Sequence, residues 1–276
     1  DGLLEIVSMD ENGHAVCKTD LPFGSYYLKE LSTDGHYILS DEKYPIVFEY
    51  AGQDTALVEI KANGGAPIEN KLLYGEIHGL KKDEDGSGLA TALIGLFRAG
   101  CTEFTTENAI LTATSAEDGS FSFVHVPYGN WIVREIEAPT GFVLSEETYP
   151  VTVDADGAVI EVELENTRIR GTVQLTKIDR DYPDNKLTGA EFTIYCDSNS
   201  NKELDADDEL VGTLTETGIG VYEMSDLLYG GYFVKETKAP EGFYLDGNAY
   251  YFEITEDGKT VTVENEAGKG FVNAPQ

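Results

Sequence analysis

The nine residues LYGGYFVKE at positions 228–236 recur as PYGNWIVRE at positions 127–135 and as PFGSYYLKE at positions 22–30. Each copy places an aromatic residue and a glycine at a turn, then continues as a strand whose side chains alternate between two faces. One face of the last copy carries Tyr232, Val234 and Glu236, and the other copies repeat this order of aromatic, aliphatic and acidic residues. If that face covers a core, each copy buries a carboxylate, which is costly unless the carboxylate has a partner.

The chain is strongly acidic. Its 276 residues include 51 aspartates and glutamates against 19 lysines and arginines, which gives a formal net charge of -32. Such a chain repels nucleic acid and anionic membrane surfaces, so we expect neither as a partner. No apolar run is long enough to cross a bilayer and no signal peptide is recognisable. We therefore expect that these residues contain no targeting signal.

The cysteines indicate neither a disulfide framework nor a metal or catalytic site. Cys17, Cys101 and Cys196 lie far apart at non-equivalent positions, and their odd number argues against a disulfide framework and against a zinc site. None has a motif relation to a histidine, which a catalytic cysteine would need. Phosphate loops and serine triads are also absent from the sequence, so we expect that the chain is not an enzyme.

A repeat of about one hundred residues organises the chain. Residues 75–83 (GEIHGLKKD) align with residues 171–179 (GTVQLTKID), and short alternating stretches separated by Asp-Gly or Asn-Gly pairs predict antiparallel hairpins. No stretch has a sustained helical period. We therefore expect an all-β chain of tandem immunoglobulin-like β-sandwiches: a first module (residues 1–74), a second module (75–170) and a third module (171–276).

The first module is expected to be incomplete at its N-terminus. Its signature glutamate, Glu30, lies 30 residues into the chain, whereas Glu135 and Glu236 follow the starts of their modules by about sixty residues. We therefore expect its opening strands to be missing from residues 1–74. They lie upstream in a longer protein, or another chain supplies a strand, because an unpaired sheet edge accepts one.

Three residue types recur at equivalent positions of the modules. They are a lysine in the first strand (Lys81, Lys177), the signature glutamate (Glu135, Glu236) and an asparagine ending the last strand (Asn166, Asn273, and Asn70 in the first module). The alternation of each strand puts these residues on its apolar face. A buried amine, carboxylate and amide are costly as separate groups, but their presence is explained if they react.

Burial lowers the pKa of an amine and raises that of a carboxylic acid, so the two can coexist in neutral forms. A neutral lysine can attack the side-chain carbonyl of asparagine, while the acid hydrogen-bonds the carbonyl oxygen and shuttles protons to the leaving ammonia. The product is an isopeptide bond between the first and last strands, formed once and without a cofactor. The alternative is a buried salt bridge beside an asparagine at a strand end.

The pattern resembles the Cna B-type, or SpaA-like, domains of Gram-positive surface proteins and pilins. The resemblance rests on residues 177–179 (KID), residues 187–192 (LTGAEF), the strand ending at Glu236, residues 239–243 (APEGF) and the terminal asparagine. It implies prealbumin-like sandwiches, lysine-to-asparagine isopeptide bonds, and a pilin or adhesin stalk that is extracellular, attached to the cell wall and partnered by other surface or pilin subunits. The alternative is an adhesin tip whose variable loops, residues 101–114 and 197–212, bind a host protein or a glycan.

Some positions depart from the family pattern. Lys81 is followed by a second lysine, Lys82, and alignment and strand parity favour Lys81 as the reactive one. Asn265 competes with Asn273 as acceptor, and Asn273 is favoured because residues 271–275 (FVNAP) close the module as in the family. The first module has no matching lysine, so its bond cannot form within this chain.

Residues 197–208 (DSNSNKELDADD) follow the spacing of a calcium loop. The expected oxygen ligands are Asp197, Asn199, Asn201, Asp205 and Asp208. Lys202 stands where such loops have a turn glycine, and Asp208 stands where they have a glutamate. A weak calcium site and an acidic solvated loop are both compatible with this stretch.

Overall fold

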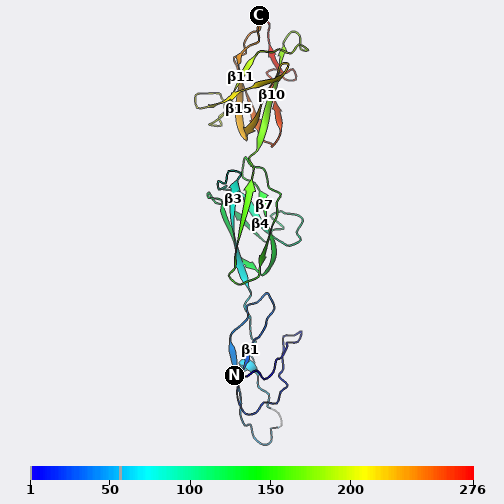
Figure 1. The fold of residues 1–276 in the computed structure, drawn as a ribbon, viewed down its shortest axis with the longest axis vertical. Helices are drawn as coiled ribbons and strands as arrows, with labels where there is room; N and C mark the ends of the chain where they lie inside the picture. The colour runs from blue at the N-terminus through cyan, green and yellow to red at the C-terminus, as the bar shows by residue number, and fades with distance from the viewer. Residues whose placement is uncertain (1, 56–57) are drawn as a thin grey trace. The chain divides into compact units, whose positions relative to one another are not determined.

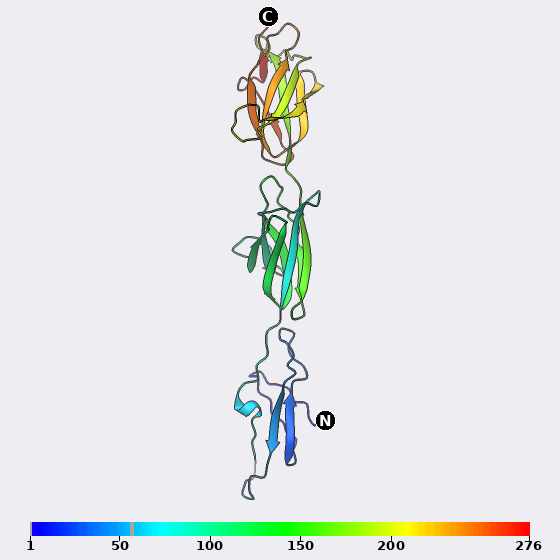
Figure 2. The ribbon, with the colours of Figure 1, turned by 90° about the vertical axis from the view of Figure 1, so that its left-hand side faces the viewer.

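The computed structural model describes residues 2–55 and 58–276, which consist almost entirely of strands and loops (Figures 1 and 2). These residues contain no α-helix and one short 3-10 helix, η1 (Ala62–Gly65). No helix in the described part of the chain has the length and apolar character needed to cross a membrane. The predicted all-β fold is confirmed.

The third module forms two sheets. Its strands are β10 (Arg170–Asp179), β11 (Glu191–Cys196), β12 (Glu209–Thr213), β13 (Thr215–Gly218), β14 (Val221–Leu228), β15 (Gly230–Lys238), β16 (Ala249–Ile254), β17 (Thr260–Thr262) and β18 (Phe271–Asn273). One sheet has the order β13-β14-β10-β17, with β18 also paired to β10, and the other has the order β12-β11-β15-β16. Strand β10 therefore lies between an antiparallel partner, β14, and parallel partners, β17 and β18.

The second module repeats this arrangement. Its strands are β3 (Tyr74–Asp83), β4 (Leu93–Arg98), β5 (Leu111–Thr114), β6 (Ser120–Pro127), β7 (Gly129–Glu137), β8 (Tyr149–Val153) and β9 (Val159–Asn166). They form sheets of order β6-β3-β9 and β5-β4-β7-β8, in which β3 pairs with β9 in parallel. Strands β3 and β10 thus occupy equivalent places, as do the signature strands β7 and β15.

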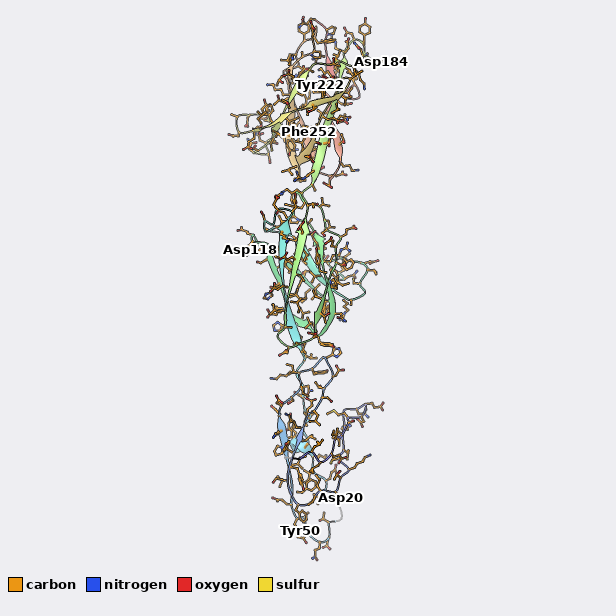
Figure 3. All side chains as sticks on the ribbon, in the orientation of Figure 1. Asp20, Tyr50, Asp118, Asp184, Tyr222 and Phe252 are labelled. Carbon is orange, nitrogen blue, oxygen red and sulfur yellow. The ribbon has the colours of Figure 1, made fainter. Side chains whose placement is uncertain are left out.

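Alternating apolar side chains fill the space between the two sheets of the third module. Val173, Leu175, Phe192 and Val234 are fully buried. The ring of Tyr222, labelled in Figure 3, packs edge-on against Phe192 with 5.1 Å between ring centroids. This period-two burial explains why the sequence reads as strands: β-branched and aromatic residues fit a half-buried pleated surface.

The recurring glycine of the signature has a conformational reason. Gly24, Gly129 and Gly230 have φ values of 157°, 141° and 151°, which residues with a Cβ rarely adopt. In the third module the turn is closed by the hydroxyl of Tyr232, which donates a 2.7 Å hydrogen bond to the Leu228 carbonyl. The signature is therefore a tight turn followed by a strand whose aromatic, aliphatic and acidic side chains face the core.

The first module contains much less regular structure. Strands β1 (Gly24–Lys29) and β2 (Lys43–Phe48) form a two-stranded antiparallel sheet. No residue in the ranges 2–55 and 58–72 is buried. A hairpin without a covering layer is marginally stable by itself.

By packing, the chain divides into two compact units. One combines residues 1–75 with 125–129 and 153–158, and the other contains residues 76–124, 130–152 and 159–276. The division into three modules that the repeat suggests stays a prediction.

Candidate functional site

The third module brings its lysine, glutamate and asparagine together inside the sandwich. Lys177 on β10, Glu236 on β15 and Asn273 on β18 are 0%, 1% and 2% exposed. Lys177 Nζ lies 2.9 Å from Glu236 Oε1 and donates a hydrogen bond to Asn273 Oδ1. Asn273 Nδ2 donates to both carboxylate oxygens of Glu236, at 2.9 and 3.0 Å.

The second module contains the same cluster. Lys81, Glu135 and Asn166 are 0%, 2% and 2% exposed. Lys81 Nζ donates to Asn166 Oδ1 and lies 3.4 Å from Glu135 Oε1, while Asn166 Nδ2 donates to the two carboxylate oxygens at 3.0 and 2.8 Å. Each carboxylate therefore contacts both the amine and the amide nitrogen.

One detail differs from the sequence-based mechanism. The acid was expected to hydrogen-bond the asparagine carbonyl oxygen. In both clusters that oxygen instead accepts from the lysine, and the glutamate accepts from the amide NH₂. The reason is chemical: a lysine ammonium can only donate and a carboxylate can only accept, so the amide oxygen faces the lysine and the amide NH₂ faces the glutamate.

Strand register fixes the lysine and the asparagine relative to each other. In the parallel pair β10–β18, Lys177 is opposite Phe271 and Asp179 is opposite Asn273. The pair β3–β9 has the same register, with Lys81 opposite Leu164 and Asp83 opposite Asn166. The lysine and asparagine of each cluster are thus two residues apart in register on adjacent strands, and their side chains point to the same face.

A turn glycine holds the backbone of each lysine. The N–H groups of Lys81 and Lys177 donate 2.7 Å hydrogen bonds to the carbonyls of Gly119 and Gly220, respectively. A Cβ on Gly119 would lie 2.0 Å from the Lys81 carbonyl oxygen, and a Cβ on Gly220 would lie 2.9 Å from the Lys177 carbonyl oxygen. The sequence marked Asp118-Gly119 as a turn but gave no sign of this contact.

A backbone amide ten residues further along the chain anchors each glutamate. Ser145 N–H donates to Glu135 Oε2 at 2.9 Å, and Asp246 N–H donates to Glu236 Oε2 at 2.8 Å. Sequence reasoning missed these contacts, although a short polar residue at the same offset from the signature was a visible signal. They orient the carboxylate toward the lysine and the asparagine.

Burial lowers the pKa of both lysines. For Lys81 the loss of water outweighs the opposing attraction of Glu135, and for Lys177 it outweighs the hydrogen bond and charge of Glu236. The surroundings differ between the modules, because Lys177 Nζ lies 4.7 Å from the ring centroid of Phe271, where the second module has the aliphatic Leu164. A lowered pKa makes the nucleophilic free amine more available.

The two alternative residues considered from the sequence, Lys82 and Asn265, lie outside the clusters. Lys82 points away from the cluster and pairs with Glu163 at 2.7 Å. Asn265 Nδ2 donates to Asp246 Oδ2 and to the Val272 carbonyl, both at 2.9 Å, and its Oδ1 accepts from the Val272 N–H. In the first module Asn70 Nδ2 donates to Glu30 Oε1 at 2.7 Å.

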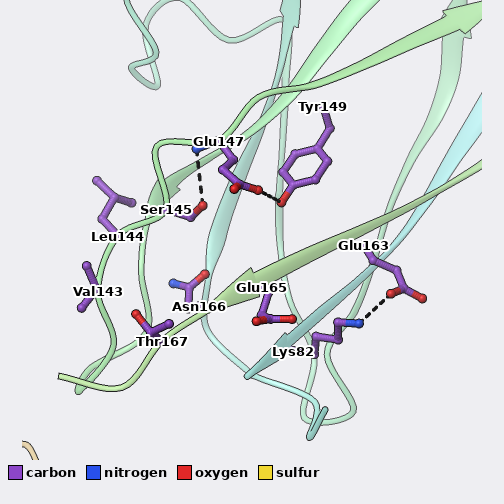
Figure 4. Close-up of a pocket in the computed structure, with 10 residues that line it drawn as sticks. All are labelled: Lys82, Val143, Leu144, Ser145, Glu147, Tyr149, Glu163, Glu165, Asn166 and Thr167. Carbon is purple, nitrogen blue, oxygen red and sulfur yellow. Dashed lines mark hydrogen bonds and ion pairs between the residues drawn. The ribbon is translucent and has the colours of Figure 1, made fainter. Parts of the chain in front are cut away.

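A surface pocket adjoins the cluster of the second module (Figure 4). Asn166 forms part of its wall, together with the segment 143–145, Glu147 and Tyr149. The Tyr149 hydroxyl donates a 2.9 Å hydrogen bond to Glu147, and burial together with this bond raises the pKa of Tyr149 to about 12. Of the three cluster residues, Asn166 lines this pocket, whereas Lys81 and Glu135 are not among its lining residues.

The loop expected to bind calcium is held by its own hydrogen bonds. Asp197 accepts from the N–H groups of Asn201 and Lys202, Asp208 accepts from Ser198 N–H, and the Asn201 side chain donates to Asp205 at 2.7 Å. Across residues 2–55 and 58–276, no group of three or more His, Cys, Asp or Glu side chains is placed to hold a metal ion. Calcium binding by this loop, through the predicted carboxylate and amide oxygens, stays a prediction.

Comparisons with known proteins address the fold. The model of the SpaA family, described as a prealbumin-like fold domain, matches residues 75–168 and 171–268. A search of curated proteins finds no match. Among solved structures, the Bacillus anthracis TIE protein is 26% identical with a TM-score of 0.69, and the match covers 93% of this chain but 44% of that one.

Two pilin structures match more weakly. The streptococcal ancillary pilin is 20% identical over 93% of this chain and 76% of that one, with a TM-score of 0.34. GBS52, the minor pilin of Streptococcus agalactiae, is 18% identical over 73% of this chain and 96% of that one, with a TM-score of 0.31. The resemblance seen in the sequence is confirmed by the two family matches, which cover most of the chain: it belongs to the SpaA family of prealbumin-like fold domains.

Proposed function

We propose that this chain is a structural part of a Gram-positive cell-surface protein, a pilin or adhesin stalk, whose second and third modules are each locked by a self-formed isopeptide bond. The observation that carries the proposal is the buried cluster of lysine, glutamate and asparagine, present once in each of these modules. Membership of the SpaA family supports an extracellular, wall-attached location with other surface subunits as partners.

The geometry suggests the following reaction. The glutamate accepts a proton from the lysine ammonium, and the freed Nζ attacks Cγ of the asparagine. The glutamic acid then gives its proton to Nδ2, the Cγ–Nδ2 bond breaks, and ammonia leaves. The glutamate takes the second proton from the attacking nitrogen and passes it to the ammonia, which departs as ammonium. One amide bond replaces another, the glutamate is regenerated, and no oxidant, metal or cofactor is consumed.

The carboxylate positions support this role. Glu135 and Glu236 each lie within 3.4 Å of the attacking amine and accept hydrogen bonds from the nitrogen that must leave. A single residue can therefore take the proton from one nitrogen and deliver it to the other. In the second module Asn166 lines a surface pocket, and we expect ammonia to reach solvent there. The reaction occurs once per module, so the chain is not an enzyme.

The placement of the bond suits a load-bearing element. The chain enters the second module through β3 and leaves it after β9, two parallel neighbours in one sheet. Tension between these ends would otherwise shear the hydrogen bonds of the sheet. A bond from Lys81 to Asn166 carries the tension covalently, so the residues between them stay folded under load.

The loops that would serve an adhesin tip offer little apolar surface. In residues 101–114 and 197–212, all described by the structure, the exposed large apolar side chains are Ile110, Leu210 and Val211. Contiguous exposed apolar patches mark interaction surfaces, but Leu210 and Val211 are only two neighbouring residues and Ile110 lies in the other module. The stalk is therefore the better-supported function.

Pulling single molecules by their two ends tests the stalk function. We expect the wild-type second and third modules to release almost no length before the tether breaks. A variant with Glu135→Ala and Glu236→Ala should instead unfold in two steps, each lengthening the chain by one module. Stepwise lengthening of the wild-type chain by whole modules would overturn the proposal.

A further inference from the structure

The strand that ends in the acceptor asparagine is interrupted in the third module. In the second module β9 pairs with β3 continuously over eight residues. In the third module the pairing is divided between β17, which faces residues 172–174, and β18, which faces residues 177–179. Residues 263–270 form a loop between these two strands. Asn273 therefore ends a strand of three residues, whereas Asn166 ends a strand of eight.

A strand of three residues makes few backbone hydrogen bonds of its own. The Asn273 carbonyl accepts from the Arg180 N–H at 2.9 Å, so this carbonyl faces the strand β10 side. Backbone groups of successive residues in a strand point to opposite edges, so those of Val272 face away from β10. An edge of this kind needs another partner, because a misplacement of about 1 Å at a reacting group can cost about a hundredfold in rate.

The side chain of Asn265 is the partner of this edge. Its Oδ1 accepts from the Val272 N–H at 2.6 Å, and its Nδ2 donates to the Val272 carbonyl at 2.9 Å. Val272 directly precedes Asn273 in the chain. One amide therefore pairs with both backbone groups of β18, as a neighbouring strand would, immediately before the acceptor.

Asp246 holds the Asn265 amide in place. Its Oδ2 accepts from Asn265 Nδ2 at 2.9 Å and from the Tyr250 hydroxyl at 2.6 Å. Burial raises the pKa of Asp246, but these hydrogen bonds outweigh it and hold that pKa below the usual 3.8, so the residue stays an acceptor at neutral pH. The Asp246 N–H also donates to Glu236 at 2.8 Å. A continuous chain of contacts therefore joins the carboxylate of the cluster to the acceptor strand.

The second module has no counterpart of this pair at the same place. Ser145 occupies the position of Asp246, ten residues after the signature glutamate, and its hydroxyl accepts from the Glu147 N–H at 3.4 Å. The hydroxyl of Tyr149 donates to Glu147, where that of Tyr250 donates to Asp246. The contact between Asp246 and an asparagine thus accompanies the interrupted strand, and the continuous β9 is held by its own pairing with β3.

We propose that Asn265 is a positioning residue for the cross-link of the third module, where its amide, held by Asp246, keeps β18 in place so that Asn273 stays in reach of Lys177. The inference rests on the isopeptide reaction proposed above. Asn265 forms no bond and transfers no proton, and it acts through the backbone of Val272. Removing its amide should slow the bond of the third module by roughly 10- to 100-fold without preventing it, because the reacting atoms meet less often in the geometry of attack.

The rate of bond formation in newly made chains tests the proposal. The full chain is produced by cell-free synthesis, synthesis is stopped with chloramphenicol, and samples are denatured in acid at intervals. Digestion and mass spectrometry then measure the links Lys81–Asn166 and Lys177–Asn273 separately. In Asn265→Ala we expect the second link to form 10- to 100-fold more slowly than in the wild type and the first link to form at the wild-type rate.

The control is Glu266→Ala, which removes an ion pair with Lys269 in the same loop and should leave both rates unchanged. Equal rates of the third-module link in Asn265→Ala and the wild type would overturn this inference alone. A wild-type chain that forms neither link would overturn the proposed function, and this inference with it.

An exchange of the two side chains separates positioning from a general loss of stability. Asn265→Asp keeps an acceptor for the Val272 N–H but sets a second carboxylate against Asp246, so the third-module link should form slowly. Adding Asp246→Asn restores a donor and an acceptor at this contact and should raise the rate several-fold above that of Asn265→Asp. Two substitutions that merely weaken the module would instead add their effects. A double variant no faster than Asn265→Asp would contradict the proposal.

Discussion

The Nζ atom of Lys177 lies 2.9 Å from Oε1 of Glu236, and both side chains are fully buried. A buried ion pair of this kind is a weak source of stability, because removing two charges from water costs about as much as their attraction returns. The same carboxylate also binds the amide nitrogen of Asn273. These contacts are the basis of our proposal that the cluster is a reaction centre and not only a salt bridge.

Glu236→Ala should leave the third module without its bond. A covalent link that closes a loop of about 100 residues stabilises a protein by about 4 to 5 kcal/mol if it behaves as a disulfide does. For a module of this size we expect the Tm to fall by roughly 20 °C or more. Calorimetry measures this change. Mass spectrometry should show that the variant has lost one ammonia instead of two.

The control for this variant is Glu256→Ala, which removes an exposed glutamate of the same module. Its Tm and mass deficit should match those of the wild type. Equal effects of the two substitutions would show that Glu236 has no special role.

The acceptor can be identified by single substitutions. Asn273→Ala should lose one ammonia instead of the two lost by the wild type, because Asn273 is the asparagine placed against Lys177. Asn265→Ala should lose both ammonia molecules, as the wild type does, since the Asn265 side chain binds Asp246 and Val272 and not Lys177. Intact masses of the two variants check this, and the reverse outcome would assign the bond to Asn265.

The two adjacent lysines of the second module should behave differently. Lys81→Arg removes the nucleophile and should cost one cross-link, because arginine is not deprotonated in proteins. Lys82→Arg should form the bond normally, since Lys82 is paired with Glu163 outside the cluster. Tandem mass spectrometry of the digested variants distinguishes the two outcomes; a normal cross-link in Lys81→Arg would contradict the assignment.

Stability of an uncross-linked variant should depend on pH. In Asn273→Ala the Lys177 amine stays free, and burial holds its pKa below the usual 10.5. Between the folded and unfolded pKa values the unfolded chain binds more protons, so stability rises with pH in that window.

The measurement is the Tm of Asn273→Ala as the pH rises toward 10.5, compared with Asn273→Ala combined with Lys177→Met. The single variant should gain stability relative to the double variant. Parallel curves would show that Lys177 is not under a burial penalty.

Much of the fold followed from the sequence because strands have a period of two. The parity of Tyr232, Val234 and Glu236 indicated which face is buried, and all three are at most 5% exposed. Parity also separated Lys81 from Lys82. These inferences needed only the alternation of side chains along one strand.

Contacts between strands distant in sequence could not be predicted in this way. The support of Lys81 by Gly119, and of Glu135 by the Ser145 amide, depends on how loops fold back over the sandwich. The role of Glu135 toward the amide nitrogen depends on the second sheet facing the first. Nor did the loop spacing of residues 197–208 reveal that its carboxylates bind its own backbone amides.

The mass of the intact, denatured wild-type chain tests the central claim most directly. Each isopeptide bond releases one ammonia, so we expect the chain to weigh two ammonia molecules less than its sequence requires. Digestion should then yield Lys81 joined to Asn166 and Lys177 joined to Asn273. A chain of unmodified mass, with these residues in separate linear peptides, would contradict the account.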